Sequence, residues 1–464
     1  MRKAQYVCGL LALVLCVMPA SAQKKRPMTK PVAGPASASQ VNFKEYKLKN
    51  GLRVFLVEDH SAPVVSLAVN YDVGSRNEKK GRTGFAHLFE HMMYQGSENV
   101  GKSEHFILVD TNGGELNGTT DEERTLYFET LPANQLELAL FLEADRMRAL
   151  DISKENLDNQ RAAVQEERRL RLDNQPYGKF FEQLNEATYD NFNYKHSVIG
   201  SMDDLNAASV EDVREFFKLY YAPNNAALAL VGDFNPTQAL ALIKKYFEVL
   251  PAQPKPPAVD IAEPAQTAER RLKVEDPLAQ VPVLIFAYKG VRGNTPDAYA
   301  LNVLSTVMGG GDSSRLYQRL VKEKQLLIQT QTFVETRRGV GGFGILAVIT
   351  PGKKQEDVEA ALNEEIARLQ SEPIADWELE KAKQFAKRSA INARQSSQGL
   401  ASSIVEATIA WNDPNLVNTR LAKIAAVTKE DVLRVAKQYL KQEVRTVGIA
   451  VPAPKGKGGA TPGQ

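Results

Sequence analysis

Two of the chain's five histidines, His87 and His91, lie four residues apart, and Glu90 immediately precedes the second. On a helix, positions i, i+3 and i+4 share one face, so these three side chains would project into the same space. Imidazole suits zinc, and a catalytic zinc usually has three protein ligands and one water molecule. A carboxylate beside that water can accept its proton. The spacing therefore predicts a zinc site in which Glu90 is the base.

The residues flanking this motif indicate that its helix is largely buried. They are apolar at Ala86, Leu88, Phe89, Met92 and Met93. Buried imidazole and carboxylate groups require a partner that balances their polarity, and a metal ion supplies one. The alternative is a surface helix with coincidental polar residues. The remaining histidines, His60, His105 and His196, lack such a pattern, and we expect them to be structural or exposed.

The elements that must position the motif predict a mixed α+β fold. Residues 46–57 are typical of a hairpin that turns at Asn50-Gly51, and a further strand is predicted at 64–71. Apolar periodicity predicts a strand near 124–131 and helices at about 82–95, 103–111, 133–149 and 153–172.

The chain also contains an internal duplication. Residues 209–234 predict a helix, a Pro-Asn-Asn turn and an apolar strand, and residues 428–451 repeat this pattern at a constant offset of 219. The proline-rich segment 251–266 predicts an extended spacer without packed structure. The expected division is a first domain at 42–250, a linker at 251–266, a second domain at 267–452 and a disordered tail at 453–464.

The N-terminus has the features of a secretory signal peptide. Two basic residues precede an apolar run, and the run is followed by the small-residue cleavage signal Ala20-Ser21-Ala22. We therefore predict a signal peptide at residues 1–22 and a periplasmic mature protein without a membrane anchor. A retained anchor is disfavoured because the run is short for a bilayer. A lipoprotein acylated at Cys16 is disfavoured by the bulky Leu15.

Composition excludes several other classes of protein. Both cysteines, Cys8 and Cys16, lie within the predicted signal peptide, so nitrogen and oxygen atoms must hold any metal in the mature chain. Without Arg2 and Lys3, the basic residues equal the 56 acidic residues in number, which argues against nucleic acid as a partner. The 43% hydrophobic and 25% charged content is that of a globular protein rather than a disordered one.

The segment GSRNEKKGRTGFAHLFEHMMYQGS, residues 74–97, resembles the inverted His-x-x-Glu-His signature of the M16 (pitrilysin- and insulinase-like) zinc metallopeptidases. The resemblance continues through GGELNGTTDEERTLYFETLP, DNQRAAVQEERR, YKHSVIGSMDDL and YYAPNNAALALVGDF, and it covers residues 42–452. The best fit is the bacterial, mitochondrial-processing-peptidase-like subfamily. This resemblance implies two homologous domains, each a mainly antiparallel sheet packed with helices, in a clam-like half-chamber.

The resemblance also implies one zinc ion per chain and a third zinc ligand. Members take this ligand from a glutamate some 76 residues after the second histidine, which is Glu167 here. Glu166 is the rival, but Leu157 and Val164 mark an apolar stripe that Glu167 continues and Glu166 leaves. Gln160 stands where many members carry a supporting glutamate. Because an amide cannot ligate as an anion, we assign Gln160 only an orienting role.

A substrate-binding residue follows from the same resemblance. Asn117 matches the family's asparagine at a strand edge, next to which a peptide adds as an extra β-strand. Such addition uses main-chain hydrogen bonds and therefore recognises extended peptide rather than one sequence. The alternative is that Asn117-Gly118 is merely a turn.

The second copy lacks the metal motif, because Leu301, Leu304 and Ser305 stand at its positions. Relatives that complete the site from this half use an arginine and, seven residues later, a tyrosine. Alignment places Val321 and Ile328 there, and neither side chain donates a hydrogen bond. Arg319 or Lys322 could substitute if the register slips, but no tyrosine lies seven residues after either. We therefore expect this chain to be the metal-bearing subunit of a heterodimer whose homologous partner supplies Arg and Tyr, with a homodimer as the alternative.

These features predict a zinc-dependent endopeptidase that acts on peptides or unfolded segments. The rival hypothesis is a non-catalytic peptide-binding or scaffold subunit, and the intact His87, Glu90, His91 and Glu167 weigh against it. A third possibility, in which zinc is purely structural, predicts no turnover.

Overall fold

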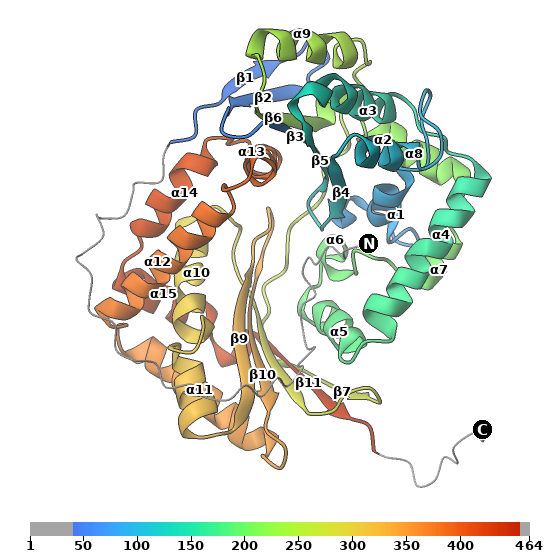
Figure 1. The fold of residues 1–464 in the computed structure, drawn as a ribbon. Coiled ribbons are helices and arrows are strands. Elements are labelled where there is room, and N and C mark those ends of the chain that lie inside the picture. The colour runs from blue at the N-terminus through green and yellow to red at the C-terminus, as the bar shows by residue number, and fades with distance from the viewer. Residues whose placement is uncertain (1–39, 455–464) are drawn as a thin grey trace, which may run out of the picture. The chain divides into compact units, whose positions relative to one another are not determined.

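The computed structural model describes residues 40–454, so the predicted signal peptide and nearly all of the predicted tail lie outside the described residues. The first half contains β1 (Lys44–Lys47), β2 (Arg53–Glu58), β3 (Val64–Tyr71), α1 (Phe85–Met92), α2 (Glu104–Thr111), β4 (Glu115–Thr120), β5 (Thr125–Pro132), α3 (Leu136–Arg148), α4 (Lys154–Arg168), α5 (Gly178–Thr188), α6 (Phe192–Lys195), α7 (Met202–Asn206), α8 (Val210–Tyr220), β6 (Ala226–Gly232) and α9 (Pro236–Phe247) (Figure 1).

The second half contains β7 (Arg270–Asp276), β8 (Val283–Lys289), α10 (Pro296–Gly309), β9 (Leu327–Glu335), β10 (Gly342–Ile349), α11 (Gln355–Ser371), α12 (Asp376–Asn392), α13 (Ser397–Trp411), α14 (Leu416–Ala425), α15 (Lys429–Tyr439) and β11 (Arg445–Pro452). None of the helices in the described part of the chain is long and apolar enough to cross a membrane.

Each half is built on one mixed, mainly antiparallel sheet. The first has the order β1-β2-β6-β3-β5-β4, and only the β2–β6 pair is parallel. The second has the order β7-β11-β8-β10-β9, and only the β7–β11 pair is parallel. Apart from the additional outer strand β1 of the first sheet, the two sheets share their strand order and the position of the parallel pair, which confirms the predicted α+β class with two homologous sheets.

The duplication extends beyond the segments that the sequence pattern revealed. Helices α8 and α15 start 219 residues apart, as do strands β6 and β11. Helices α5 and α13 share this offset. They are therefore equivalent elements of the two copies.

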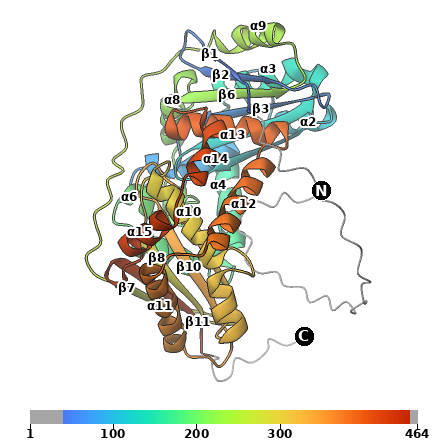
Figure 2. The same ribbon diagram turned by 90° about the vertical axis from the view of Figure 1, so that its left-hand side faces the viewer.

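These two equivalent helices are exchanged between the halves. Ala401, Ile404 and Val405 of α13 pack on the first sheet (Figures 1 and 2). Phe180 and Leu184 of α5 pack on the second sheet. Because the other face of each sheet carries the main core of its own half, the central strands are buried on both faces, as in the fully buried run of β6.

The proline-rich segment 251–266 contains no helix or strand, but its last residues are packed. The carboxylate of Glu263 accepts hydrogen bonds from the backbone N–H groups of Asp190 and Asn191, at 2.8 and 3.0 Å. Gln266 is buried and donates to the carbonyl of Arg445 at 2.7 Å. The expectation that the spacer lacks packed structure is therefore wrong for this end.

Candidate metal centre

Helix α1 presents the histidine motif from a mostly apolar helix. Phe85, Leu88 and Phe89 are buried in the core of the first half. The helix begins after Gly84, whose φ of 88° lies in the left-handed region that favours glycine. A Cβ atom there would also lie only 2.6 Å from the carbonyl oxygen of Ile199. The sequence therefore fixes both the start of α1 and the face that it buries.

The three predicted ligands come together where α1 meets α4. The Nε2 atom of His91 lies 3.2 Å from Oε2 of Glu167, and Nε2 of His87 lies 3.6 Å from the same oxygen. Their side chains are 25%, 12% and 16% exposed for His91, His87 and Glu167, so the group is largely enclosed yet reachable from solvent. Glu166 points elsewhere and pairs with Arg169 at 3.0 Å on the exposed side of α4.

This geometry fits a zinc ion. Zinc bonds of about 2.0–2.2 Å in a tetrahedral site place neighbouring ligand atoms ~3.4 Å apart. The observed nitrogen-to-oxygen distances of 3.2 and 3.6 Å bracket that value, and one atom from each of the three residues lies within 4.8 Å of the others. Two neutral imidazoles and one carboxylate are a known donor set for catalytic zinc.

The charge states of the three residues also suit a cation. Burial, followed by the charge of His91, lowers the pKa of His87 to about 4, so this ring is neutral at neutral pH. Burial opposes ionisation of Glu167, but its hydrogen bond to His91 and the charges of both histidines lower its pKa to about 2. Burial lowers the pKa of His91, and Glu167 more than restores it, giving a net rise. Glu167 is therefore ionised at neutral pH, the form in which a carboxylate binds a metal ion.

Glu90 lies beside the three ligands and faces strand β4. Its Oε2 atom accepts a hydrogen bond from the hydroxyl of Thr120 at 2.7 Å. Burial raises the pKa of Glu90, and the Thr120 bond opposes this rise. Gly118 packs directly against it, because a Cβ atom at this glycine would lie 2.8 Å from Cγ of Glu90. Strand β4 therefore holds the carboxylate from one side.

Strand β4 is an outer strand of the first sheet, and among residues 40–454 it pairs only with β5. Asn117 belongs to this strand, opposite Phe128, and its side-chain oxygen accepts from the N–H of Gly118 at 2.8 Å. Asn117 is therefore in a strand rather than a turn, and that strand contacts Glu90 through Gly118 and Thr120. Its contact with a peptide substrate stays a prediction.

Two further side chains touch the ligands. Gln160 is buried, donates to Asn159 at 2.7 Å and contributes to the raised pKa of His91, while its orienting role stays a prediction. Arg171, which sequence analysis did not identify, pairs with Oε1 of Glu167 at 2.7 Å. Its spacing of four residues from Glu167 is the usual signal of a helical ion pair, so this pairing could have been predicted.

In the second half, the positions of the motif are part of the core. Leu301 and Leu304 are buried in α10, and Ser305 is hydrogen-bonded to Thr332 at 3.0 Å. Val321 is partly buried against the same core, and Ile328 is half exposed on the outer strand β9. None of these side chains can ligate a metal as an anion or hold a substrate carbonyl with a charge.

A second group of possible ligands, His105, Glu129 and Glu143, is buried in the first half. The guanidinium of Arg146 already lies within it, donating to Glu143 at 3.0 Å and stacking on the ring of Tyr127 at 4.4 Å. His105 contacts Glu129 at 3.1 Å. An internal cation thus balances this group, which is consistent with the structural role expected for His105.

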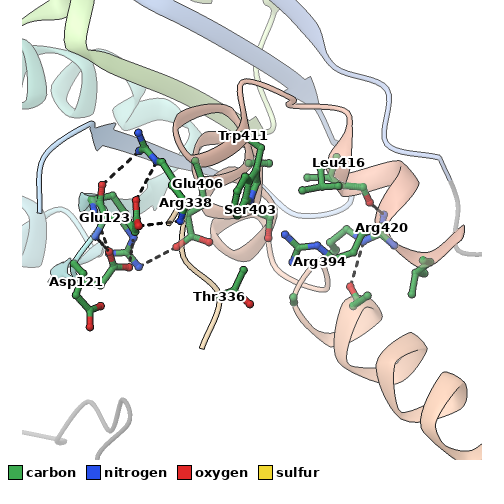
Figure 3. Close-up of a pocket in the computed structure, with 18 residues that line it drawn as sticks. Asp121, Glu123, Thr336, Arg338, Arg394, Ser403, Glu406, Trp411, Leu416 and Arg420 are labelled. Carbon is green, nitrogen blue, oxygen red and sulfur yellow. Dashed lines mark hydrogen bonds and ion pairs between the residues drawn. The ribbon is translucent and has the colours of Figure 1, made fainter. Parts of the chain in front are cut away.

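A separate cavity has a volume of about 290 Å³ and a lining that includes none of the motif residues. Its lining residues are drawn in Figure 3. Residues 121–124 of the β4–β5 turn line it together with residues of the second half, among them Arg394 and Trp411. Arg124 links this cavity to strand β4, because it donates to the carbonyl of Thr119 at 2.8 Å and pairs with Glu406 at 3.0 Å. The β4–β5 turn is thereby tied to α13.

Comparison with known proteins matches each half of the chain to a family model of the M16 peptidases. A family model described as Insulinase (Peptidase family M16) matches residues 53–202, and one described as Peptidase M16 inactive domain matches residues 207–385. Zinc protease PqqE of Helicobacter pylori is 30% identical over 408 residues, which cover 87% of this chain and 92% of that protein. A protein of Arabidopsis thaliana named probable mitochondrial-processing peptidase subunit beta is 25% identical, covering 85% of this chain and 75% of its own.

Solved structures of two other proteins have the same fold as this chain. The crystal structure of a protease from Helicobacter pylori has a TM-score of 0.84 at 30% identity and covers 89% of this chain and 100% of that one. A Pseudomonas fluorescens structure described as a peptidase M16 inactive domain has a TM-score of 0.79 at 18% identity, covering 90% and 99%, and shares the fold.

The fold and the His-x-x-Glu-His helix thus define the class as that of two-domain, metallopeptidase-like proteins. The chain belongs to peptidase family M16. The relatives named zinc proteases imply zinc as its metal.

Proposed function

We propose that this chain is an exported zinc endopeptidase that hydrolyses peptides or unfolded segments. One observation carries the proposal, namely that His87, His91 and Glu167 converge beside Glu90, which contacts the outer strand β4. The three ligands would hold one zinc ion. When bound, this ion would polarise the scissile carbonyl and make a water molecule more acidic.

The residues of this chain would perform the remaining steps. Extended substrate would pair with the main chain of β4, which brings its carbonyl group past Glu90. Glu90 would accept one proton from the attacking water, whose oxygen bonds to the carbonyl carbon. When the C–N bond breaks, Glu90 would return a proton to the leaving amine. Thr120 would keep the carboxylate oriented through its 2.7 Å hydrogen bond.

Glu90→Gln tests this mechanism, because it preserves the shape of the side chain and removes the base. We expect the variant to bind one zinc ion per chain and to lose peptide cleavage by a factor of at least about 100. Zinc content and cleavage of an unstructured peptide are measured on the same preparation. Retained metal with unaltered cleavage would exclude Glu90 as the base. Absence of cleavage in the wild type, alone and with a partner, would favour the non-catalytic peptide-binding subunit.

We further propose that the active form is a heterodimer. Val321 and Ile328, at the two positions where relatives carry arginine and tyrosine, cannot donate a hydrogen bond to the substrate carbonyl, and one relative is named a probable mitochondrial-processing peptidase subunit beta. The partner would be a homologous chain without His-x-x-Glu-His that carries Arg-x6-Tyr. Cleavage is measured for each chain alone and for the mixture, and we expect the mixture to be the most active. Full activity of a self-associated single chain would support the homodimer instead.

Export is proposed from the predicted signal peptide and places the mature protein in the periplasm. Mass spectrometry of the protein from a fractionated bacterial host should then find a chain that starts at Gln23 in the periplasmic fraction. An uncleaved chain in the cytoplasmic fraction would contradict this proposal.

A further inference from the structure

The carboxylate of Glu78 lies at the start of α1, the helix that carries both histidines of the motif. One oxygen accepts a hydrogen bond from the backbone N–H of Gly84 at 2.9 Å, and the other accepts from that of Ala86 at 2.8 Å. The first N–H groups of a helix have no partner within it. Gly84 has no side chain that could cap them, so Glu78 performs this function from outside the helix.

His196 supports this carboxylate. Its Nε2 atom lies 2.9 Å from Glu78, and its Nδ1 atom lies 2.7 Å from the carbonyl oxygen of Phe192. Both ring nitrogens therefore face acceptors, an arrangement that only the positively charged ring satisfies fully. The ring also stacks on that of Phe192, with 4.5 Å between centroids. The Glu78 side chain is 0% exposed, and a carboxylate so buried requires a hydrogen-bonded partner.

The segment that carries His196 also contacts the second ligand helix. Arg168, which directly follows the ligand Glu167, donates to the carbonyl of Gly200 at 2.7 Å. Gly200 packs closely against the start of α1, because a Cβ atom there would lie 2.4 Å from the carbonyl oxygen of Thr83. One short segment, residues 196–200, therefore touches the start of α1 and the end of α4.

We propose that Glu78 and His196 are positioning residues of the metal centre, which hold the first turn of α1 in register with α4. His87 immediately follows Ala86, whose N–H is bound by Glu78, so a shift of this turn moves the first ligand directly. The inference rests on the proposed zinc site, but it does not require that the site cleave peptides. Outer partners that orient metal ligands typically contribute about 10- to 100-fold to affinity or activity.

The test compares His196→Phe, which keeps a ring to stack on Phe192 but no donor, with His196→Gln, which keeps a donor toward Glu78. His60→Gln is the matched control, because His60 also lies between two acceptors, Asp233 at 2.5 Å and Glu58 at 2.8 Å, but on the exposed surface. The zinc Kd is measured by competition with a chelator, and kcat and KM are measured with an unstructured peptide. The unfolding temperature of the zinc-free protein is measured as well.

We expect His196→Phe to raise the zinc Kd by about 10-fold or more and to lower kcat with little change in KM. His196→Gln should recover part of both losses, and His60→Gln should match the wild type. Wild-type zinc Kd and kcat in folded His196→Phe would overturn the proposal, even if the variant melted earlier, since that result describes a packing residue only. If His196→Phe does not fold, His196→Gln decides, because an unchanged Kd and kcat overturn the proposal and a partial loss supports it.

The outcome for the proposed peptidase is read separately. A raised zinc Kd in the variants of a wild-type chain that cleaves no peptide would support the positioning role and contradict the peptidase. Unchanged zinc binding in the variants of a wild-type chain that cleaves peptides would contradict the positioning role and support the peptidase.

Discussion

Gly118 is the position at which one added methyl group should most directly disturb the proposed base. A Cβ atom there would lie 2.8 Å from Cγ of Glu90 and 3.2 Å from the ring of Tyr127. Carbon atoms in favourable contact are about 3.5–4.0 Å apart, so Gly118→Ala requires Glu90 to move by roughly 1 Å. That movement would break or lengthen the hydrogen bond from Thr120, which is 2.7 Å long.

The expected effect is on turnover rather than on substrate binding. A misplacement of about 1 Å can lower a rate by about 100-fold. Side chains of a strand stand perpendicular to the sheet, so the methyl group would point toward α1 and leave the main-chain edge of β4 open for a peptide. We therefore expect Gly118→Ala to lower kcat by about 10- to 100-fold, with KM and zinc content close to those of the wild type.

Steady-state cleavage of a fluorogenic peptide, zinc content and thermal unfolding are measured together. Overpacking costs about 1–3 kcal/mol of stability, so cleavage is compared well below the unfolding temperature of the variant. Thr120→Val is the matched variant, because it removes the hydrogen bond to Glu90 without adding volume, and its loss of kcat should be smaller. A folded, zinc-loaded Gly118→Ala protein with wild-type kcat would refute the placement of Glu90 as the base.

Three other outcomes follow from the structure. Glu167→Ala should raise the zinc Kd by more than the factor of about 10 to 100 that is typical of residues that only orient a ligand. Glu166→Ala should leave the zinc Kd unchanged, because Glu166 forms only an exposed ion pair with Arg169, and such pairs contribute little energy. Competition with a chelator measures the zinc Kd of both variants. Burial raises the pKa of Glu129 from 4.5 to about 8, so the stability that this group contributes is complete below pH 4.5 and is lost as the pH rises through 8. In urea unfolding, the free energy of unfolding should therefore fall less between about pH 5 and pH 9 for Glu129→Gln than for the wild type. An equal fall in both proteins would contradict this assignment. Burial lowers the pKa of His105 from 6.5 to about 3, so the stability that this group contributes is complete above pH 6.5 and is lost as the pH falls toward 3. In the same assay, His105→Gln should lose less free energy of unfolding than the wild type as the pH falls from 6.5 toward 3.

Local patterns in the sequence predicted most of the elements near the site. The predicted hairpin is β1–β2, the strand predicted at 64–71 is β3, and α1 and α4 lie within the predicted helices. These elements could be predicted because each buries one face of its own residues, and burial leaves a periodic pattern along the chain. The same periodicity separated Glu167 from Glu166, which point in different directions from α4.

Strand β4 left no such pattern. Its residues, ELNGTT, are mostly polar and only Gly118 is buried, because an outer strand has one unpaired edge and little apolar contact. Its place came from the family resemblance rather than from periodicity. The closeness of Gly118 to Glu90, which makes this strand part of the site, became visible only in the folded chain.

The sequence by itself determined the metal-binding residue types, their faces on two helices and the duplication of the chain. Tertiary structure alone decided that α5 and α13 exchange sheets, that Glu78 and His196 hold the start of α1, and that Glu263 packs the end of the spacer. The physical reason is the separation along the chain between the residues that interact. A helix face is set by neighbours three or four residues away, whereas a pair such as Glu78 and His196 depends on which surfaces meet across 118 positions of chain, and local periodicity carries no record of that choice.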